Sequence, residues 1–342
     1  MPEVVGDSID RLCAIEIRYA PAEHAVPRGV TTPIFEAARA AAGQPMSYLA
    51  ASRLLERVHA GDRVLVVCGS GSPPFLPYGE TDGPLGGAAI ARALEYGVGA
   101  KPVLVSEANM MPANLAAVGA AGLAVHDEAI FGVRPHSALA VAFPCGMDTR
   151  PEVEALFEAQ RPAAVVFVER TGPNAAGVYH SIRGTAKRPD EIMAGHLFAE
   201  VARERGVLTV GIGDGGNEIG FGNVVEVIRA VQPAGRSCLC PCGQGVATIV
   251  GTDVLVAAAV SNWGAYGVVA MLAYLLEQPD LLQDDDMEYR MLQAAVAVGA
   301  SDGVYAAPIM AVDGTSWRVQ RALVTMLREI VVNGLTPLGR GF

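Results

Sequence analysis

Residues 63–72 read Arg-Val-Leu-Val-Val-Cys-Gly-Ser-Gly-Ser, a short apolar run that stops at a turn rich in glycine and serine. A run without polar alternation predicts a strand that is buried on both faces, as in a parallel sheet covered by helices. Similar runs follow along the chain, at residues 102–106, 138–143, 163–168, 207–212 and 253–258. This pattern predicts a doubly wound, mainly parallel sheet with helices on both faces, a three-layer α/β/α fold.

The stretches between these runs have the composition of helices. We predict helices at residues 85–96, 112–121, 151–160, 189–206, 223–231, 264–277, 285–299 and 316–333. Thr31-Thr32-Pro33 is typical of a helix start, and the helix that follows, residues 34–58, breaks at 43–45. The sequence therefore predicts an N-terminal helical extension over residues 1–60 and a single α/β/α domain over residues 61–342.

Composition narrows the class of protein. Hydrophobic residues make up 51% of the 342 residues, which is enough for a large core and excludes intrinsic disorder. The net charge is −11 and no run of Lys and Arg occurs, so we expect no nucleic-acid partner and no membrane partner. The start of the chain lacks a signal pattern, which favours a cytoplasmic protein. We expect a small carboxylic or amino acid as substrate, and the apolar helices favour a homo-oligomer.

Nearly every polar cluster directly follows a predicted strand. In order along the chain, these clusters contain Glu80 and Asp82; Glu169, Arg170 and Asn174; His180 and Arg183; Asp214, Asn217 and Glu218; and Ser261, Asn262 and Trp263. Ligands of such folds bind beyond the carboxyl ends of the strands. The distribution therefore predicts an active site at one edge of the sheet.

Two of the clusters offer carboxylates on glycine-rich loops. In Gly79-Glu-Thr-Asp-Gly-Pro84, Glu80 and Asp82 either cap the following helix or act on a cation or substrate amine, and we favour the second. In Gly213-Asp-Gly-Gly-Asn-Glu218, the side chains of Asp214, Asn217 and Glu218 are hard oxygen ligands. Together with Asp82 they form the predicted metal site. Acids at this turn would repel a pyrophosphate and no P-loop is present, so we expect no nucleotide cofactor.

The remaining clusters supply groups for acid–base chemistry and substrate binding. Glu169 is either a catalytic base or a scaffold partner of Arg170, and both interpretations remain open. His180 lies in a polar loop and is the predicted general acid. Arg170 and Arg183 have the fork geometry that suits a substrate carboxylate. We also assign substrate binding to Asn174, Ser261, Asn262 and Trp263, although Ser261 or Asn262 could simply cap a helix.

The cysteines and two late aspartates give weaker signals. Cys238-Leu-Cys240-Pro-Cys242 lacks the spacing of a zinc site and has no second Cys or His pair nearby, so we interpret it as buried cysteines lining a turn, with a nucleophilic Cys242 as the alternative. The other cysteines, Cys13, Cys68 and Cys145, are expected to be buried. Asp302-Gly303 and Asp313-Gly314 are typical of turns, although Asp302 could fold back to the site.

Four of these motifs, taken in order, resemble one known family. They are Glu80-Thr-Asp-Gly-Pro84, Glu169-Arg-x-Gly-x-Asn174, Gly213-Asp-Gly-Gly-Asn-Glu218 with Gly220 and Gly222, and Val260-Ser-Asn-Trp-Gly264. The chain is similar, from about the first strand to its end, to the C-terminal domain of the D-glutamate cyclase family. The resemblance implies cyclisation of D-glutamate to 5-oxo-D-proline with loss of water, helped by a divalent cation such as Mn²⁺ or Mg²⁺.

The resemblance leaves alternatives open. Mitochondrial members of the family carry a further N-terminal domain, so a separate subunit could replace that domain here. The chain would then be a non-catalytic ligand-binding subunit that needs a partner. A third interpretation is a hydrolase or isomerase that acts on a related lactam, amide or hydroxy acid. For the cyclisation itself, we expect Glu80 or Glu169 to be the base and His180 to protonate the departing hydroxide.

Overall fold

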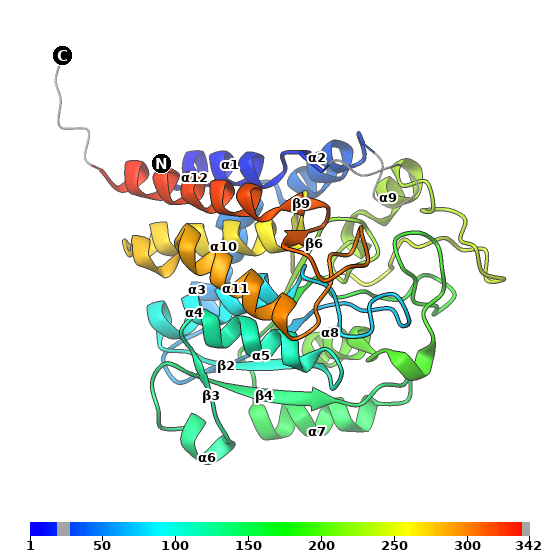
Figure 1. Cartoon of the computed structure of the whole chain (residues 1–342), viewed down its shortest axis with the longest axis horizontal. Helices are drawn as coiled ribbons and strands as arrows, with labels where there is room; N and C mark the ends of the chain where they lie inside the picture. Colours follow the sequence, from blue (N-terminus) through cyan, green and yellow to red (C-terminus); the bar gives the residue numbers. More distant parts are fainter. Residues whose placement is uncertain (19–27, 337–342) are drawn as a thin grey trace.

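The computed structural model describes residues 1–18 and 28–336. Its main sheet contains seven parallel strands in the order β3-β4-β2-β1-β5-β6-β7, with helices on both faces, which confirms the predicted α/β/α fold (Figure 1). The strands are β1 (Arg63–Cys68), β2 (Lys101–Glu107), β3 (Ala124–Val125), β4 (Ser137–Phe143), β5 (Ala164–Val168), β6 (Leu208–Gly213) and β7 (Val254–Ala257).

In the central strands β1, β2 and β5, alternate side chains enter two separate cores. In β1, Val64 and Val66 point into the larger core, whereas Leu65 and Val67 point into the smaller one on the opposite face. All four side chains are fully buried. A strand between two cores needs apolar residues at every position, which explains the continuous apolar runs in the sequence.

Helices cover the sheet unequally. The smaller core lies under α6 (Glu128–Phe131), α7 (Arg150–Gln160) and α8 (Gly195–Glu204). The larger core is covered by α3 (Met46–Arg57), α4 (Pro84–Val98), α5 (Met111–Ala120), α10 (Ser261–Leu275) and α11 (Asp285–Ala297). Farther out on this side, α1 (Pro2–Cys13) and α12 (Trp317–Leu335) lie side by side (Figure 1). Near β7 lie α2 (Thr31–Ala42) and α9 (Val225–Val231).

The helices of residues 1–60 share the core of the sheet. Ile9 of α1, Ile34 of α2 and Leu54 of α3 are fully buried in the same cluster as the β1 side chains. A domain boundary at residue 60 stays a prediction.

The helix predicted over residues 189–206 is wrong in its first part. A short 3₁₀ turn (Pro189–Glu191) is followed by extended chain, and α8 begins only at Gly195. The backbone N–H of Met193 donates to the Glu107 carboxylate at 2.8 Å, which draws this segment toward the sheet and away from helical geometry. The short elements β3, α6, β8 (Ala311–Val312) and β9 (Thr315–Ser316) were not predicted, because two to four residues are too few to show a period.

The winding of the sheet creates a crevice between β1 and β5. After β1 the chain forms β2, β3 and β4 on one side of β1, and then returns to form β5, β6 and β7 on the other side. Loops that follow β1 and β5 therefore diverge, which is where ligands bind in doubly wound folds. These loops gather on the right-hand side of Figure 1. None of the described helices has the length and apolar character needed to cross a membrane.

Trp263, which the sequence analysis assigns to substrate binding, lies in the hydrophobic core. Every residue of α10 from Ser261 to Ala273 is buried, and Trp263 is 0% exposed. Its indole Nε1–H donates to Oε1 of Gln320 in α12 at 2.7 Å. The side chain thus ties α10 to α12, far from solvent.

We predict that Trp263→Ala lowers the free energy of unfolding by about 3–5 kcal/mol, because it leaves a large cavity in the core. Trp317→Ala is the matched control, since Trp317 is only partly buried and packs edge-on against Tyr289. Chemical denaturation of both variants measures the difference. Equal losses in the two variants would contradict the placement of Trp263.

Candidate active site

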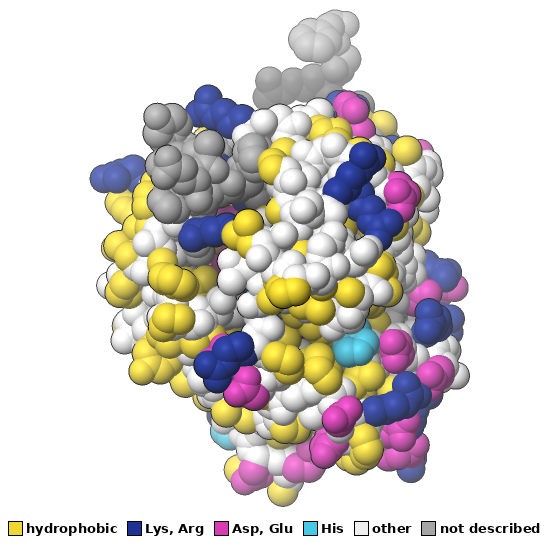
Figure 2. Space-filling model, turned by 90° about the vertical axis from the view of Figure 1, so that its right-hand side faces the viewer, with side chains coloured by type: hydrophobic (Ala, Val, Ile, Leu, Met, Phe, Trp, Pro, Cys, Tyr) yellow, Lys and Arg dark blue, Asp and Glu magenta, His cyan; other side chains and the backbone are white. Residues whose placement is uncertain are grey.

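A pocket opens at the carboxyl edge of the sheet, beside the crevice between β1 and β5. Its volume is about 330 Å³, and its walls come from the segments 70–80, 169–191, 214–218 and 303–313, together with Arg18. Figure 2 looks onto this side of the molecule, where acidic and basic side chains are mixed and densest toward the lower right. The concentration of acidic groups described below is therefore inside the pocket rather than on the visible surface.

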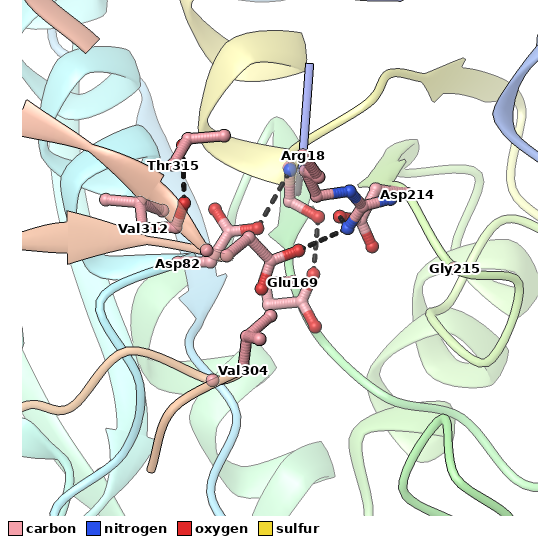
Figure 3. Close-up of polar contacts among 12 residues, drawn as sticks. Arg18, Asp82, Glu169, Asp214, Gly215, Val304, Val312 and Thr315 are labelled. Carbon is pink, nitrogen blue, oxygen red and sulfur yellow. Dashed lines mark hydrogen bonds and ion pairs between the residues drawn. The ribbon is translucent and has the colours of Figure 1, made fainter. Parts of the chain in front are cut away.

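Three carboxylates from three different loops meet beneath this pocket. Asp82 follows β1, Glu169 follows β5 and Asp214 follows β6, and oxygen atoms of the three lie within 4.8 Å of one another. Figure 3 shows them gathered with Arg18 at the ends of the strands. Two of the three, Asp82 and Asp214, belong to the metal site predicted from the sequence.

Asp82 is held by the start of α10. Its carboxylate accepts hydrogen bonds from the backbone N–H groups of Ser261 at 2.9 Å and Asn262 at 2.7 Å. The Asn262 side chain returns the contact, because its Oδ1 accepts from the N–H groups of Gly83 and Gly86. Ser261 and Asn262 thus fix the loop that carries Asp82. Burial raises the pKa of Asp82 well above its ordinary value, and the nearby Asp313 charge adds to the rise.

Gly83 allows this loop to lie against the neighbouring turn. Its φ is +100°, and a Cβ atom at this position would lie 2.8 Å from the backbone of Gly69. Only glycine combines this conformation with such a close approach.

Glu169 adopts a backbone conformation that is rare for its residue type. Its φ is +50°, at the point where β5 ends. The Ser261 hydroxyl donates to its carboxylate. Burial raises the pKa of Glu169 well above its ordinary value, and the negative charges of Glu218 and Glu80 raise it further. A strained backbone that aims a buried acid into a pocket is typical of a functional position.

Arg18 joins two acids across the pocket. One guanidinium nitrogen, Nη1, donates to Asp214 at 2.9 Å and to Asp313 at 2.5 Å. No motif in the sequence predicts a site role for Arg18, and Asp313-Gly314 is typical of a turn. Asp302 acts as a turn residue, since it accepts from the N–H groups of Val304, Tyr305 and Gly314 and shapes the loop.

Lys187 is a second basic group that the sequence did not reveal. It is 8% exposed, and its Nζ donates to the Ser70 hydroxyl at 2.6 Å. Burial lowers the pKa of Lys187, while the charge of Glu80 opposes this shift. For Glu80, burial raises the pKa well above its ordinary value and Asp313 adds to the rise, against the positive charge of Lys187. The charges of Glu80 and Lys187 therefore act on each other's pKa.

The comparisons with known proteins agree with this geometry. Residues 30–328 match the family model described as D-glutamate cyclase-like, C-terminal. The chain belongs to this family. It is also 34% identical over 112 residues to "D-glutamate cyclase, mitochondrial" of Homo sapiens, a match that covers 33% of this chain and 17% of the human protein. The family resemblance inferred from the four motifs is thus confirmed, and three of its motifs, around Glu80, Glu169 and Asp214, line the pocket.

The donor set of this family member fits a hard divalent cation. Acidic groups at the pocket outnumber the buried basic groups Arg18 and Lys187; they are Glu80, Asp82, Glu169, Asp214, Glu218 and Asp313. Asn217 lines the pocket with an Oδ1 atom that has no hydrogen-bond partner among the described residues. Carboxylate and amide oxygens are the ligands that Mg²⁺ and Mn²⁺ prefer.

Glu218, another predicted metal ligand, is engaged with its own loop. Its carboxylate accepts from the N–H of Gly216 at 2.8 Å and from that of Gly215 at 3.3 Å. These contacts fix the glycine-rich turn that carries Asp214. Glu218 lines the pocket but does not belong to the group of three close carboxylates.

Three other predicted site residues lie elsewhere. Arg170 is 2% exposed and forms a two-pronged ion pair with Glu107, so it has the scaffold arrangement that the sequence left open, with Glu107 rather than Glu169 as its partner. Asn174 and His180 point toward the cysteines of residues 238–242. Arg183 does reach the pocket, where its Nη2 donates to the carbonyl oxygens of Gly303 and Val304.

We predict that the stability of the Mg²⁺-free protein falls as the pH rises. Burial raises the pKa values of Asp82, Glu169 and Asp214, so the folded chain binds more protons than the unfolded chain above about pH 4. Stability is then full below the unfolded pKa values and is lost as the pH rises toward the folded ones. At neutral pH, Mg²⁺ at about one hundred times its Kd restores about 3 kcal/mol. Thermal unfolding against pH, with and without Mg²⁺, measures both effects.

The same experiment needs two variants. Asp214→Asn removes one of the three close carboxylates and is expected to abolish the Mg²⁺-dependent rise in Tm. Asp190→Asn is the control, because Asp190 is exposed and pairs with Arg188, outside the group of three close carboxylates. An equal Mg²⁺ effect in wild type and Asp214→Asn would contradict this placement of the cation.

Proposed function

We propose that this protein is a lyase that cyclises an amino-dicarboxylic acid, with D-glutamate as the first candidate, to a 5-oxoproline-type lactam with loss of water. Membership of the D-glutamate cyclase-like family supports the reaction type. The volume of the pocket, about 330 Å³, suits a ligand of this size.

The observation that carries the proposal is a pair of unsatisfied polar atoms at the pocket. Arg18 Nη2, a donor, and Asn217 Oδ1, an acceptor, are buried and lack hydrogen-bond partners among the described residues. Buried polar groups are nearly always hydrogen-bonded, so unpaired ones of both kinds point to a ligand that supplies both. An amino acid offers a carboxylate for the arginine and an ammonium group for the amide oxygen and the surrounding acids.

The reaction moves two protons within the substrate. The nitrogen attacks the γ-carboxyl carbon, a C–N bond forms and a C–O bond breaks. Two protons leave the ammonium nitrogen and depart with the carboxylate oxygen as water, so no net proton is gained or lost. A single group with a raised pKa can carry them from nitrogen to oxygen.

Glu80 is suited to this proton transfer. It lines the pocket, and burial raises its pKa, which makes the Glu80 carboxylate a stronger base toward the ammonium protons of the substrate. Lys187 and Arg18 are the buried cations available to hold the substrate carboxylates. In this assignment Glu80, rather than His180 as expected from the sequence, protonates the departing oxygen.

Asp82, Glu169 and Asp214 are the residues that would hold a divalent cation. When bound, such a cation supplies positive charge that polarises a carboxyl group and stabilises a developing oxyanion. The hydrogen bonds from Ser261 and Asn262 keep the carboxylates of Asp82 and Glu169 in position, and Arg18 holds that of Asp214.

We predict that the purified chain forms 5-oxoproline from one enantiomer of glutamate, and that Glu80→Gln lowers kcat by about 100-fold or more, since general acid–base catalysis contributes at least this much. Glu191→Gln is the matched control, because Glu191 also lines the pocket but pairs with Arg188. Chromatographic detection of 5-oxoproline with D- and L-glutamate, in the presence of Mg²⁺ or Mn²⁺, measures the rates.

The outcomes separate the alternatives. Full activity of folded Glu80→Gln would exclude Glu80 as the proton carrier. A wild-type chain that opens 5-oxoproline or a related lactam but forms none would favour a hydrolase. A chain that binds glutamate without turnover, and gains activity only with a second protein, would favour a ligand-binding subunit.

A further inference from the structure

A second cluster of ligand-type side chains lies outside the acidic pocket. It joins His180, from the loop after β5, to Cys238, Cys240 and Cys242, some sixty residues later in the chain. The three sulfur atoms lie 3.3–3.5 Å from one another. The Nε2 atom of His180 lies 3.2 Å from the sulfur of Cys240 and 3.8 Å from that of Cys242.

These distances match the edges of a zinc tetrahedron. With Zn–S bonds of about 2.3 Å and Zn–N bonds of about 2.0 Å, ligand sulfurs lie about 3.8 Å apart and a sulfur and a nitrogen about 3.5 Å apart. The observed separations are within about 0.5 Å of these values. A disulfide would bring two sulfurs to about 2.05 Å, and no pair in this cluster is that close.

The burial of these cysteines is unlike that of core residues. Cys13 and Cys68 are buried in the larger core, as the sequence predicted, whereas Cys238, Cys240 and Cys242 are only partly buried. The expectation of buried cysteines lining a turn is therefore wrong for these three. Hydrophobic burial therefore does not explain why these three cysteine side chains lie together in a partly exposed loop.

The second ring nitrogen of His180 is oriented as in metal sites. Its Nδ1 lies 3.1 Å from the carbonyl oxygen of Val178, which accepts a hydrogen bond from Nδ1 when this nitrogen carries the ring proton. The lone pair of Nε2 then points at the sulfurs, the arrangement by which a carbonyl fixes the tautomer of a ligating histidine. Asn174 adds a contact from outside the cluster, since its Nδ2 donates to the sulfur of Cys242 at 3.4 Å.

We propose that His180, Cys238, Cys240 and Cys242 bind one Zn²⁺ ion in a closed, structural site. Four protein ligands fill a tetrahedral zinc shell, so no position remains for a substrate. Three thiolates select a soft ion, whereas the carboxylates of the pocket select a hard one, so the two sites are chemically distinct. The proposal does not depend on the cyclase activity.

The zinc site holds a wall of the acidic pocket in place. The N–H of Leu239 donates to the carbonyl of Gly184, which fastens the cysteine loop to the segment that carries Lys187. The carbonyl of His180 accepts from Asn217 Nδ2 at 3.1 Å, which reaches the glycine-rich loop beside Asp214. One ion thus joins the loop that carries His180 to the cysteine loop, and the contact from Asn217 extends this link to the glycine-rich loop.

Elemental analysis of the whole chain, purified without a metal-affinity tag and incubated with Zn²⁺ before removal of free ion, tests the proposal. We expect about one zinc per chain. Cys242→Ser and His180→Ala are expected to weaken zinc affinity by at least about tenfold, measured by competition with a chromophoric chelator. Cys145→Ser is the control, since Cys145 is exposed, contrary to the sequence expectation, and lies outside the cluster.

A second measurement on the unaltered chain guards against variants that fail to fold. Replacement of the zinc by Co²⁺ is expected to give thiolate charge-transfer absorption and the visible bands of a tetrahedral ion. Wild-type protein that takes up no zinc, that shows octahedral cobalt bands, or whose mass is lower by two hydrogens through a disulfide would overturn the proposal. Zinc content and affinity that are unchanged in both folded variants would overturn it as well.

Discussion

The pairing of β1 with β5 is the constraint on which the rest of the structure depends. The two strands lie side by side in parallel register, with Val66 opposite Val166, although nearly one hundred residues separate them. Because the chain leaves them in opposite directions across the sheet, the loops that follow them cannot fill the space above both. That space is the pocket, and every loop that borders it carries at least one acid.

The second constraint is the burial of the acids at the base of the pocket. They lie next to an apolar core, where little water is present to stabilise their charge. The structure meets this constraint with oriented donors rather than with equal numbers of cations. Backbone N–H groups hold Asp82 and Glu218, a hydroxyl holds Glu169, and Arg18 serves two aspartates at once. Buried carboxylates whose negative charge is only partly stabilised by such donors have raised pKa values, and these are the ones suited to binding a proton or a cation.

The sequence predicted what depends on local pattern. The six longer strands were found because each is a mostly apolar run, with those in the centre of the sheet buried on both faces, and the acidic loops were found because they follow those strands. Arg18 and Asp313 could not be found, since their roles come from contacts between distant segments. The grouping of His180 with Cys238, Cys240 and Cys242 could not be found either, because a ligand set with one residue between cysteines and a distant histidine has no recognisable spacing. Trp263 was assigned to the site by its position, but packing placed it in the core.

Asp82 gives the first turn of α10 a further property. Its two oxygen atoms accept the N–H groups of Ser261 and Asn262, while the same carboxylate lies beside Glu169 and Asp214. A carboxylate that binds a proton or a cation is a weaker acceptor for these amides than a free one. The rate of hydrogen exchange at the backbone N–H groups of Ser261 and Asn262 therefore reports whether Asp82 is charged, and it can be measured without substrate.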